Sequence, residues 1–163
     1  FAGGKGFRAK LTQTVAEAIG APEKTIQLLC QTIEFIHNSS LLHDDLIDHS
    51  PLRRGKTSAW LKYTPEYAVL AGDYLLARVM VNLSKFGNIE LVQLTSQSIS
   101  DLLEGEWLQD SIVKNPMMMP QEIDRVHMLK TSSLFKWCLK APYVAMGITD
   151  KTLMSQLLSL IHI

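Results

Sequence analysis

Apolar residues recur along this chain with helical spacing, and no stretch alternates between apolar and polar positions. The pattern is clearest between Pro22 and Asp48. There, apolar side chains recur every three or four residues, as in a helix that buries one face: Ile26, Leu29, Ile33, Ile36, Leu41 and Leu42. Pro22 falls in the first turn, where the N–H group that proline lacks would have no helical partner anyway.

The same spacing predicts the order of the elements. We expect helices over about residues 7–19, 22–48, 65–86, 89–111 and 121–147, and a further helix starting near residues 149–150. Residues 53–63 and 114–120 are predicted loops. Long helices joined by short loops predict an all-α bundle of antiparallel neighbours, which forms a single domain over residues 1–163.

Composition narrows the class of protein. Hydrophobic residues make up 47 % of the 163 residues and charged residues 20 %, which is typical of a globular domain with a core. Sixteen basic residues balance sixteen acidic ones, so the overall charge gives no reason to expect a nucleic-acid partner. Cys30 and Cys138 lie in apolar helical contexts, which predicts buried, reduced thiols.

The two ends both look truncated. The chain starts at Phe1 without Met, and it stops at 160–163 without a Gly, Asn or Pro signal that would end a helix. No run approaches the roughly 18 apolar residues of a membrane span. We therefore expect a cytoplasmic protein without a transmembrane segment, and any targeting segment would lie before Phe1.

The segment 37–48 carries the most informative chemistry. At 100° per residue, His37 and Asp44 lie within about 20° of each other on a helix, and Asp48 lies about 40° further round. Carboxylates one turn apart repel each other, and Mg²⁺ would relieve this repulsion because it prefers a few carboxylates together with phosphate oxygens and water. The alternative is a solvated acidic cluster. The position at a helix C-terminus disfavours it, because the helix dipole opposes anions there.

Two basic segments flank these aspartates. Arg53, Arg54 and Lys56 follow them closely, where they would meet phosphates held by a metal ion. The alternative is that this loop only forms surface salt bridges with the aspartates. Near the N-terminus, Lys5 and Arg8 lie in a Gly-rich segment at the start of a helix, which is a natural anion site.

Several motifs occur in one order from Gly3 to about Lys136: GGK-x-x-R at 3–8, IHxxSLLHDDxxD at 36–48, RRGK at 53–56, VLAGDYLLA at 69–77, EGEWLQ at 104–109 and KTSSLF at 130–135. The ordered set resembles the trans-type isoprenyl diphosphate synthases, and HDDxxD followed by RRG is its most specific part. The resemblance implies an all-α fold around a deep central cavity. It also implies head-to-tail condensation of isopentenyl diphosphate with an allylic prenyl diphosphate, with Mg²⁺ as the cofactor.

Residue roles follow from the same resemblance. Asp44 and Asp48 match the aspartates that bind Mg²⁺, with Asp45 beside them. Arg53 and Lys130 match the residues that contact the allylic diphosphate.

Isopentenyl diphosphate has its own implied set of contacts: Lys5, Arg8, His37 and Arg54. Gln109 is expected near the reacting centre, whereas His43 is expected to be structural. The family also implies a homodimer. Apolar positions on the two middle helices could serve its interface or the core equally well: Val69, Leu76, Leu91 and Leu94.

The length of the product depends on residues just before the first aspartate. In the family, a bulky aromatic residue four or five positions before it gives short products. Ser40 and Ser39 occupy these positions here, which predicts an open pocket and a product longer than farnesyl. Phe35 or Ile36 could close the pocket lower down, and the two serines could also serve close helix packing.

The family's second aspartate-rich motif does not occur in these 163 residues, so the chain alone is expected to be inactive. Glu104 and Glu106 form another acidic pair but are not expected to replace it. Three alternatives remain: a class I terpene cyclase, a non-catalytic subunit of a heteromeric synthase, and a helical bundle with chance motifs. The first would not need the isopentenyl diphosphate contacts, and the second would be expected to lose aspartates or arginines that are retained here.

Overall fold

The computed structural model describes residues 6–113, 120–149 and 159. It confirms the predicted all-α class. The helices are α1 (Phe7–Ala18), α2 (Glu23–Ile47), α3 (Ala59–Lys62), α4 (Pro65–Phe86), α5 (Ile89–Val113), α6 (Pro120–His127), the π-helix η1 (Met128–Ser132) and α7 (Ser133–Ala145). Two short strands, β1 (Leu52–Arg53) and β2 (Lys56–Thr57), form the one described sheet.

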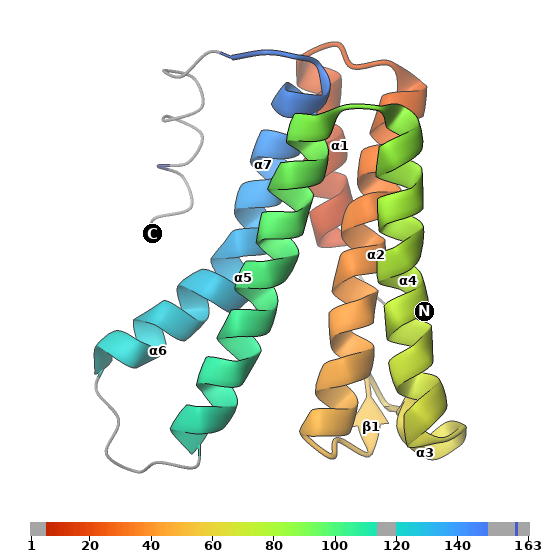
Figure 1. Cartoon of the computed structure of the whole chain (residues 1–163), viewed down its shortest axis with the longest axis vertical. Coiled ribbons are helices and arrows are strands. Elements are labelled where there is room, and N and C mark those ends of the chain that lie inside the picture. Colours follow the sequence, from red (N-terminus) through yellow and green to blue (C-terminus); the bar gives the residue numbers. More distant parts are fainter. Residues whose placement is uncertain (1–5, 114–119, 150–158, 160–163) are drawn as a thin grey trace.

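The long helices pack as two pairs joined by α1 (Figure 1). α2 lies beside α4, α5 lies beside α7, and α1 contacts both α2 and α7. The strands and α3 lie at the end of the α2–α4 pair, where α2 carries its aspartates. α6 and η1 continue α7 along the other end of α5. This arrangement brings the C-terminal end of α2 opposite the α5–η1 pair.

The turn between α4 and α5 shows why the predicted boundaries held. Thr64 accepts a hydrogen bond from the Tyr67 N–H at 3.3 Å, and Pro65 occupies the first turn of α4. Gly87 ends α4 in the left-handed region at φ 81°, which favours glycine. The Asn88 side chain then accepts from the Leu91 N–H at 2.9 Å and donates to the Val144 carbonyl oxygen at 2.9 Å, which joins this turn to α7.

The core lies where the two helix pairs meet α1. Its largest member, Trp137, is fully buried and donates its indole N–H to Thr95 Oγ1 at 2.9 Å. Around it lie apolar side chains of α2, α4, α5 and α7: Leu29, Ile33, Ile36, Val79, Leu83, Leu91, Leu102, Leu134, Cys138 and Ala141. Both cysteines are free; Cys138 is buried as predicted, whereas Cys30 is only partly buried.

The predicted loop at 53–63 is wrong in detail, because it contains the β1–β2 hairpin and α3. Leu52 pairs with Thr57 and Arg53 with Lys56, around a two-residue turn with φ 54° at Arg54 and 74° at Gly55. Two consecutive positive φ values are typical of the tight hairpin turns that usually carry Asn-Gly. Arginine at the first position gives no such sequence signal.

The predicted helix over 121–147 is helical but not uniform, since η1 interrupts its α-helical hydrogen bonding. The further helix expected from residues 149–150 falls almost wholly outside the described residues. Within the part of the chain that the structure describes, no helix is long and apolar enough to cross a bilayer.

Candidate active site: two charge clusters across a cavity

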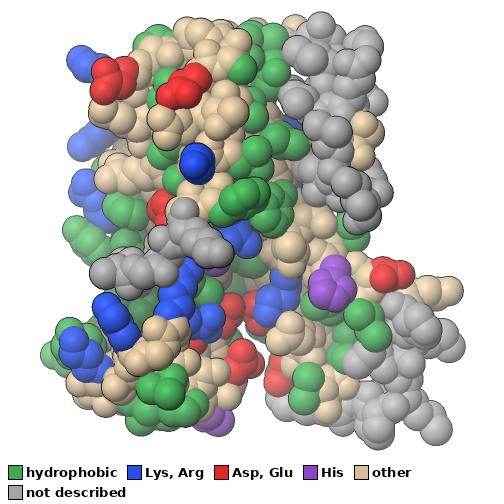
Figure 2. All heavy atoms as spheres, turned by 180° about the vertical axis from the view of Figure 1, so that it is seen from behind, with side chains coloured by type: hydrophobic (Ala, Val, Ile, Leu, Met, Phe, Trp, Pro, Cys, Tyr) green, Lys and Arg blue, Asp and Glu red, His purple; other side chains and the backbone are tan. Residues whose placement is uncertain are grey.

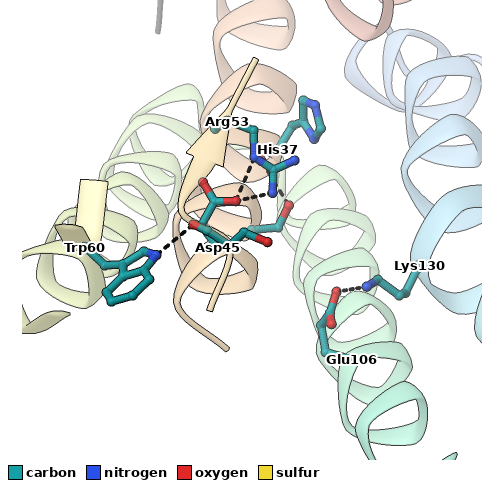
Figure 3. A network of polar contacts seen from close by, with 8 residues as sticks. His37, Asp45, Arg53, Trp60, Glu106 and Lys130 are labelled. Atoms are coloured by element: carbon teal, nitrogen blue, oxygen red, sulfur yellow. Dashed lines mark hydrogen bonds and ion pairs between the residues drawn. The ribbon is translucent and has the colours of Figure 1, made fainter. Parts of the chain in front are cut away.

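Asp45 lies at the hairpin side of α2 and is paired with Arg53 (Figure 3). Its carboxylate is 4 % exposed and accepts a hydrogen bond from Arg53 Nε at 2.7 Å, with Arg53 Nη2 on the same oxygen. The hydrogen bond to Asp45 raises the pKa of Arg53. The Trp60 indole N–H donates to the Ser50 carbonyl oxygen at 3.0 Å and ties α3 to the end of α2. Hence one predicted alternative, a salt bridge between the basic loop and the aspartates, is realised at Asp45.

Asp44 points away from the hairpin and into a cavity of about 220 Å³. Among the described residues, its buried Oδ1 has no hydrogen-bond partner. Burial, followed by the negative charge of Glu106, raises the pKa of Asp44 to about 7, although Lys130 opposes this shift. A carboxylate with an unpaired buried oxygen beside a second acidic group is destabilised by its own charge.

This arrangement fits a hard cation. The orphaned Asp44 oxygen and the exposed Asp48 at the end of α2 offer hard oxygen ligands. Within residues 6–113 and 120–149, no group of three or more acidic, His or Cys side chains converges as a complete ligand set. Mg²⁺ commonly takes only one or two carboxylates and completes its shell with phosphate oxygens and water. The residues present therefore fit a metal ion that shares its shell with a diphosphate.

A second cluster faces Asp44 from α5 and η1. Lys130 Nζ pairs with Glu106 Oε1 and donates to Gln109 Oε1 at 3.0 Å (Figure 3). The two side chains of the ion pair are largely buried, 12 % exposed for Glu106 and 21 % for Lys130. Gly105 makes the close approach possible, because a Cβ atom there would lie 2.8 Å from Lys130 Cγ and 3.1 Å from the Lys130 backbone nitrogen.

Two of the residues predicted to hold isopentenyl diphosphate, Arg8 and His37, contact each other. Arg8 Nη1 donates to His37 Nε2 at 3.2 Å, and the Arg8 guanidinium lies 5.1 Å from the Phe135 ring centre. Burial, and then the charges of Arg8, Arg54 and Arg53, lower the pKa of His37 to about 4, so His37 is neutral and accepts from Arg8. Lys5 lies outside the described residues.

The cavity beside Asp44 is mostly apolar and contains both predicted product-length residues. Ser39 and Ser40 line it together with side chains from α2, α4 and α5: Ile36, His43, Leu46, Ile47, Val69, Leu76, Ile99, Leu102, Leu103, Glu106 and Trp107. Ser39 Oγ also donates to the Gly72 carbonyl oxygen at 2.9 Å, so this serine serves helix packing as well. Ile36 lines the cavity, whereas Phe35 packs against the core.

His43 has a structural position, as expected. Its Nε2 lies 3.3 Å from the Val69 carbonyl oxygen and 3.4 Å from Asp73 Oδ1 on α4. A Cβ atom at Gly72 would lie 2.3 Å from His43 Nε2, so only glycine leaves room for the ring. The glycine of VLAGDYLLA thus allows α4 to approach the aspartate helix closely.

Sequence reasoning underrated Glu106, which it treated only as a poor replacement for a missing motif. Glu106 lines the same cavity as Asp44, where, after burial, its charge and a side-chain hydrogen bond raise the pKa of Asp44, and it also contacts Lys130. A signal was available: Glu106 lies three residues before Gln109, so the two share a helix face. Figure 2 shows acidic and basic side chains gathered in the hollow between the two lower parts of the molecule.

Comparison with known proteins identifies the class. The family model described as Polyprenyl synthetase matches residues 1–162, and the chain belongs to this family. Among curated relatives, the octaprenyl diphosphate synthase of Escherichia coli is 31 % identical over 149 residues, which cover 91 % of this chain and 46 % of that protein. The mitochondrial hexaprenyl pyrophosphate synthase of Saccharomyces cerevisiae is 52 % identical over 81 residues, which cover 50 % of this chain and 17 % of that protein.

Solved structures agree with the sequence comparisons. A decaprenyl diphosphate synthase from Rhodobacter capsulatus superposes with a TM-score of 0.91 at 32 % identity, over 98 % of this chain and 49 % of that chain. A geranyltranstransferase from Thermotoga maritima gives a TM-score of 0.89 at 33 % identity, over 98 % of this chain and 60 % of that chain. This chain therefore spans about half of the length of the octaprenyl and decaprenyl diphosphate synthases, less of the yeast protein and somewhat more of the Thermotoga protein.

Proposed function

We propose that this chain supplies one part of the active site of a trans-prenyltransferase, which joins isopentenyl diphosphate head-to-tail to an allylic prenyl diphosphate and releases pyrophosphate. One observation carries the proposal: Asp44, which has an oxygen without a partner among the described residues, lines an apolar cavity together with Glu106, the carboxylate that pairs with Lys130. An acidic site for a metal-bound diphosphate, next to a pocket for a hydrocarbon tail, is what an allylic diphosphate requires.

The chemistry needs no protein nucleophile. The C–O bond of the allylic diphosphate breaks, and the double bond of isopentenyl diphosphate forms a C–C bond with the allylic carbon. The resulting cation then transfers a proton to the released pyrophosphate and forms the new double bond. Bound Mg²⁺, held by Asp44 and Asp48, would neutralise charge on the departing pyrophosphate. Lys130 and Arg53 would add positive charge to that group. The helices around the cavity would exclude water from the allylic cation.

Isopentenyl diphosphate would bind at the neighbouring cationic site. Arg8, Arg54 and Lys5 would hold its diphosphate, and neutral His37 would keep the Arg8 guanidinium in place. This site lies on the α1 side of α2, while the allylic diphosphate would lie on the Asp44 side. The two substrates would then meet at α2, which favours the prenyl synthase over a cyclase that binds only one of them.

The product is proposed to be longer than farnesyl, as in the relatives named for hexaprenyl, octaprenyl and decaprenyl products. Ser40 is the position to test, because Ser39 is 1 % exposed and held by Gly72. Ser40→Phe would fill the upper part of the cavity and shorten the product, whereas Ser40→Ala would leave its length unchanged. Product chromatography decides, and unchanged lengths in both variants would contradict this role.

The chain is also proposed to act with residues that supply a second aspartate-rich motif, and as a homodimer. α4 exposes an apolar and aromatic stripe with helical spacing, which suits a partner surface: Tyr67, Leu70, Tyr74 and Val81. Of the positions left open between interface and core, Leu91 is fully buried in the core. Sedimentation would show the oligomeric state. The cytoplasmic location stays a prediction, and the yeast relative is named as mitochondrial.

The decisive assay uses the parent polypeptide, meaning the longest natural chain that contains this sequence. It is incubated with Mg²⁺, labelled isopentenyl diphosphate and farnesyl diphosphate. We expect long prenyl products, and none from the 163-residue chain alone. A folded parent polypeptide that makes no product would refute a self-sufficient enzyme and favour the subunit, whereas cyclised hydrocarbon formed without isopentenyl diphosphate would indicate a cyclase.

A further inference from the structure

Lys130 is occupied by protein acceptors at the place where the proposed function needs it to bind phosphate. Glu106 Oε1 and Gln109 Oε1 both contact its ammonium group, and both come from one face of α5. A diphosphate that approaches Lys130 must therefore compete with the Glu106 carboxylate. The competition takes place in a largely buried setting, where a charged partner has more effect than at the surface.

The backbone is shaped to maintain this contact. Lys130 lies in η1, and short π-helical segments are found frequently at functional sites. Gly105, next to Glu106, lets η1 approach α5 more closely than any side chain would allow. A surface ion pair needs neither feature. On the same helix, Glu104 pairs with Arg125 while half of its side chain is exposed.

We propose that Glu106 is a positioning residue that holds Lys130 near Asp44. When the allylic diphosphate binds, it replaces Glu106 as the partner of the Lys130 ammonium group. The proposal rests on the function proposed above and deepens it. Before substrate arrives, Glu106, which lines the cavity, pairs with Lys130 and neutralises its charge. After the exchange, the Glu106 carboxylate lies free on the same cavity as Asp44 and adds a second acidic group there.

The test separates the charge of Glu106 from its shape. Glu106→Gln keeps the size and one acceptor oxygen but removes the charge that competes with phosphate. Glu104→Gln is the matched control, two residues away on the same helix and paired with a different cation. Binding of inorganic diphosphate to the parent polypeptide is measured by calorimetry in EDTA, so that no turnover or metal contributes.

We expect Glu106→Gln to bind diphosphate about three- to tenfold more tightly than the unaltered protein, and Glu104→Gln to bind equally well. In a Lys130→Met background, the Glu106 substitution should have no effect, because its action passes through Lys130. Failure of Glu106→Gln to bind more tightly would overturn the proposal. A gain that persists without Lys130 would also overturn it, since Glu106 would then repel the diphosphate directly.

Steady-state kinetics give a second readout. In Glu106→Gln, KM for farnesyl diphosphate should fall and kcat should drop about tenfold, because Lys130 is less well placed, while KM for isopentenyl diphosphate stays unchanged. An equal change in both KM values would indicate a merely structural role and overturn the proposal. If the unaltered protein makes no prenyl product, the proposed function is wrong. If the unaltered protein turns over normally but Glu106→Gln and Glu104→Gln bind diphosphate equally well, only the inference about Glu106 is wrong.

Discussion

Asp44 and Asp45 are neighbours in the sequence but belong to opposite surroundings. Asp45 is buried against the hairpin and shares its charge with Arg53. Asp44, 100° further round α2, lies on the cavity with an oxygen that has no partner among the described residues, and its pKa is raised to about 7. Asp45 therefore has a charged partner in the fold, whereas one oxygen of Asp44 has none within the described part of the chain. Side chains whose charge is unfavourable for the folded structure tend to be functional residues.

The difference shows how one acidic motif can serve two purposes. The Asp45–Arg53 pair fixes the hairpin on the end of α2, and the hairpin in turn carries Arg54 towards His37. Asp44 contributes nothing comparable to the fold.

The largest effect is expected from Asp44→Asn. The variant keeps the shape of the side chain but removes the charge that would hold a cation, so turnover should fall at least about a hundredfold. The free energy of unfolding at pH 8 should stay equal or rise, because a buried carboxylate without a partner is removed. Product formation and urea denaturation of the parent polypeptide measure both. Substantial destabilisation with normal turnover would reverse the roles assigned to the two aspartates.

The complementary variant is Asp45→Asn. It leaves Arg53 without its partner and should lower the free energy of unfolding by about 2 to 3 kcal/mol, less than for a fully buried pair because Arg53 is 39 % exposed. Urea denaturation measures the loss. Asp48→Asn is the control, since Asp48 is exposed at the end of the same helix and should change stability by less than about 0.5 kcal/mol. Equal losses in both variants would contradict a special role for the Asp45 pair.

A smaller effect is expected from Gly105→Ala, which tests the cluster opposite Asp44. The added methyl group would press on Lys130 Cγ and on the backbone of η1, so η1 must move away from α5. We expect a loss of about 1 to 2 kcal/mol in unfolding free energy. Turnover should fall as well, because Lys130 moves away from Asp44. Glu104 is exposed on the same helix, so the control Glu104→Ala should change neither the unfolding free energy nor turnover. If Gly105→Ala also changes neither, the close approach of η1 to α5 is unimportant.

Most of the fold could be predicted from sequence, because helix boundaries here carry strong local signals. Pro65 and Gly87 bound α4 as expected, and the apolar stripe of α2 lies in the core. The hairpin was missed because Arg54 adopts φ 54° without the Asn or Gly that usually announces it. The π-helix was missed because no Gly or Pro within Met128–Ser132 interrupts the helical pattern there. The close packing of η1 on Gly105 of α5 is a contact between elements that a local pattern does not show.

The candidate site shows the same limit. Asp44 lines the cavity, whereas His37 contacts Arg8 of α1, although helical spacing put the two on one face of α2. The roles of Lys130 and Arg53 came from the family resemblance and stay predictions. Sequence could not tell which aspartate Arg53 contacts, because that depends on how the hairpin folds back. It also could not bring Glu106 to Lys130, since the two lie on different helices. Contacts between elements decide these pairings, and local pattern does not encode them.

The smallest effect concerns His37, which is matched to its surroundings only while it is neutral. Its pKa is about 4 in the fold, against about 6.5 in an unfolded chain. As pH falls below 6.5, His37 therefore becomes protonated in the unfolded state, but in the folded state it becomes protonated only near pH 4. The free energy of unfolding decreases over this pH range. Above pH 6.5 the effect is absent. Because His37 is only partly buried, we expect a loss of about 1 kcal/mol between pH 7 and 5.

Urea denaturation of the parent polypeptide at pH 7 and pH 5, with His37→Gln beside it, isolates this contribution. The variant should lose about 1 kcal/mol less than the unaltered protein over the same pH interval. Arg8→Gln should remove part of the difference, because the Arg8 charge is the largest cause of the lowered pKa after burial. Identical pH dependence in the unaltered protein and His37→Gln would mean that His37 takes up its proton in the fold as readily as in the unfolded chain. The Arg8–His37 contact would then not keep the imidazole neutral, and the isopentenyl diphosphate site would gain a fourth cation at mildly acidic pH.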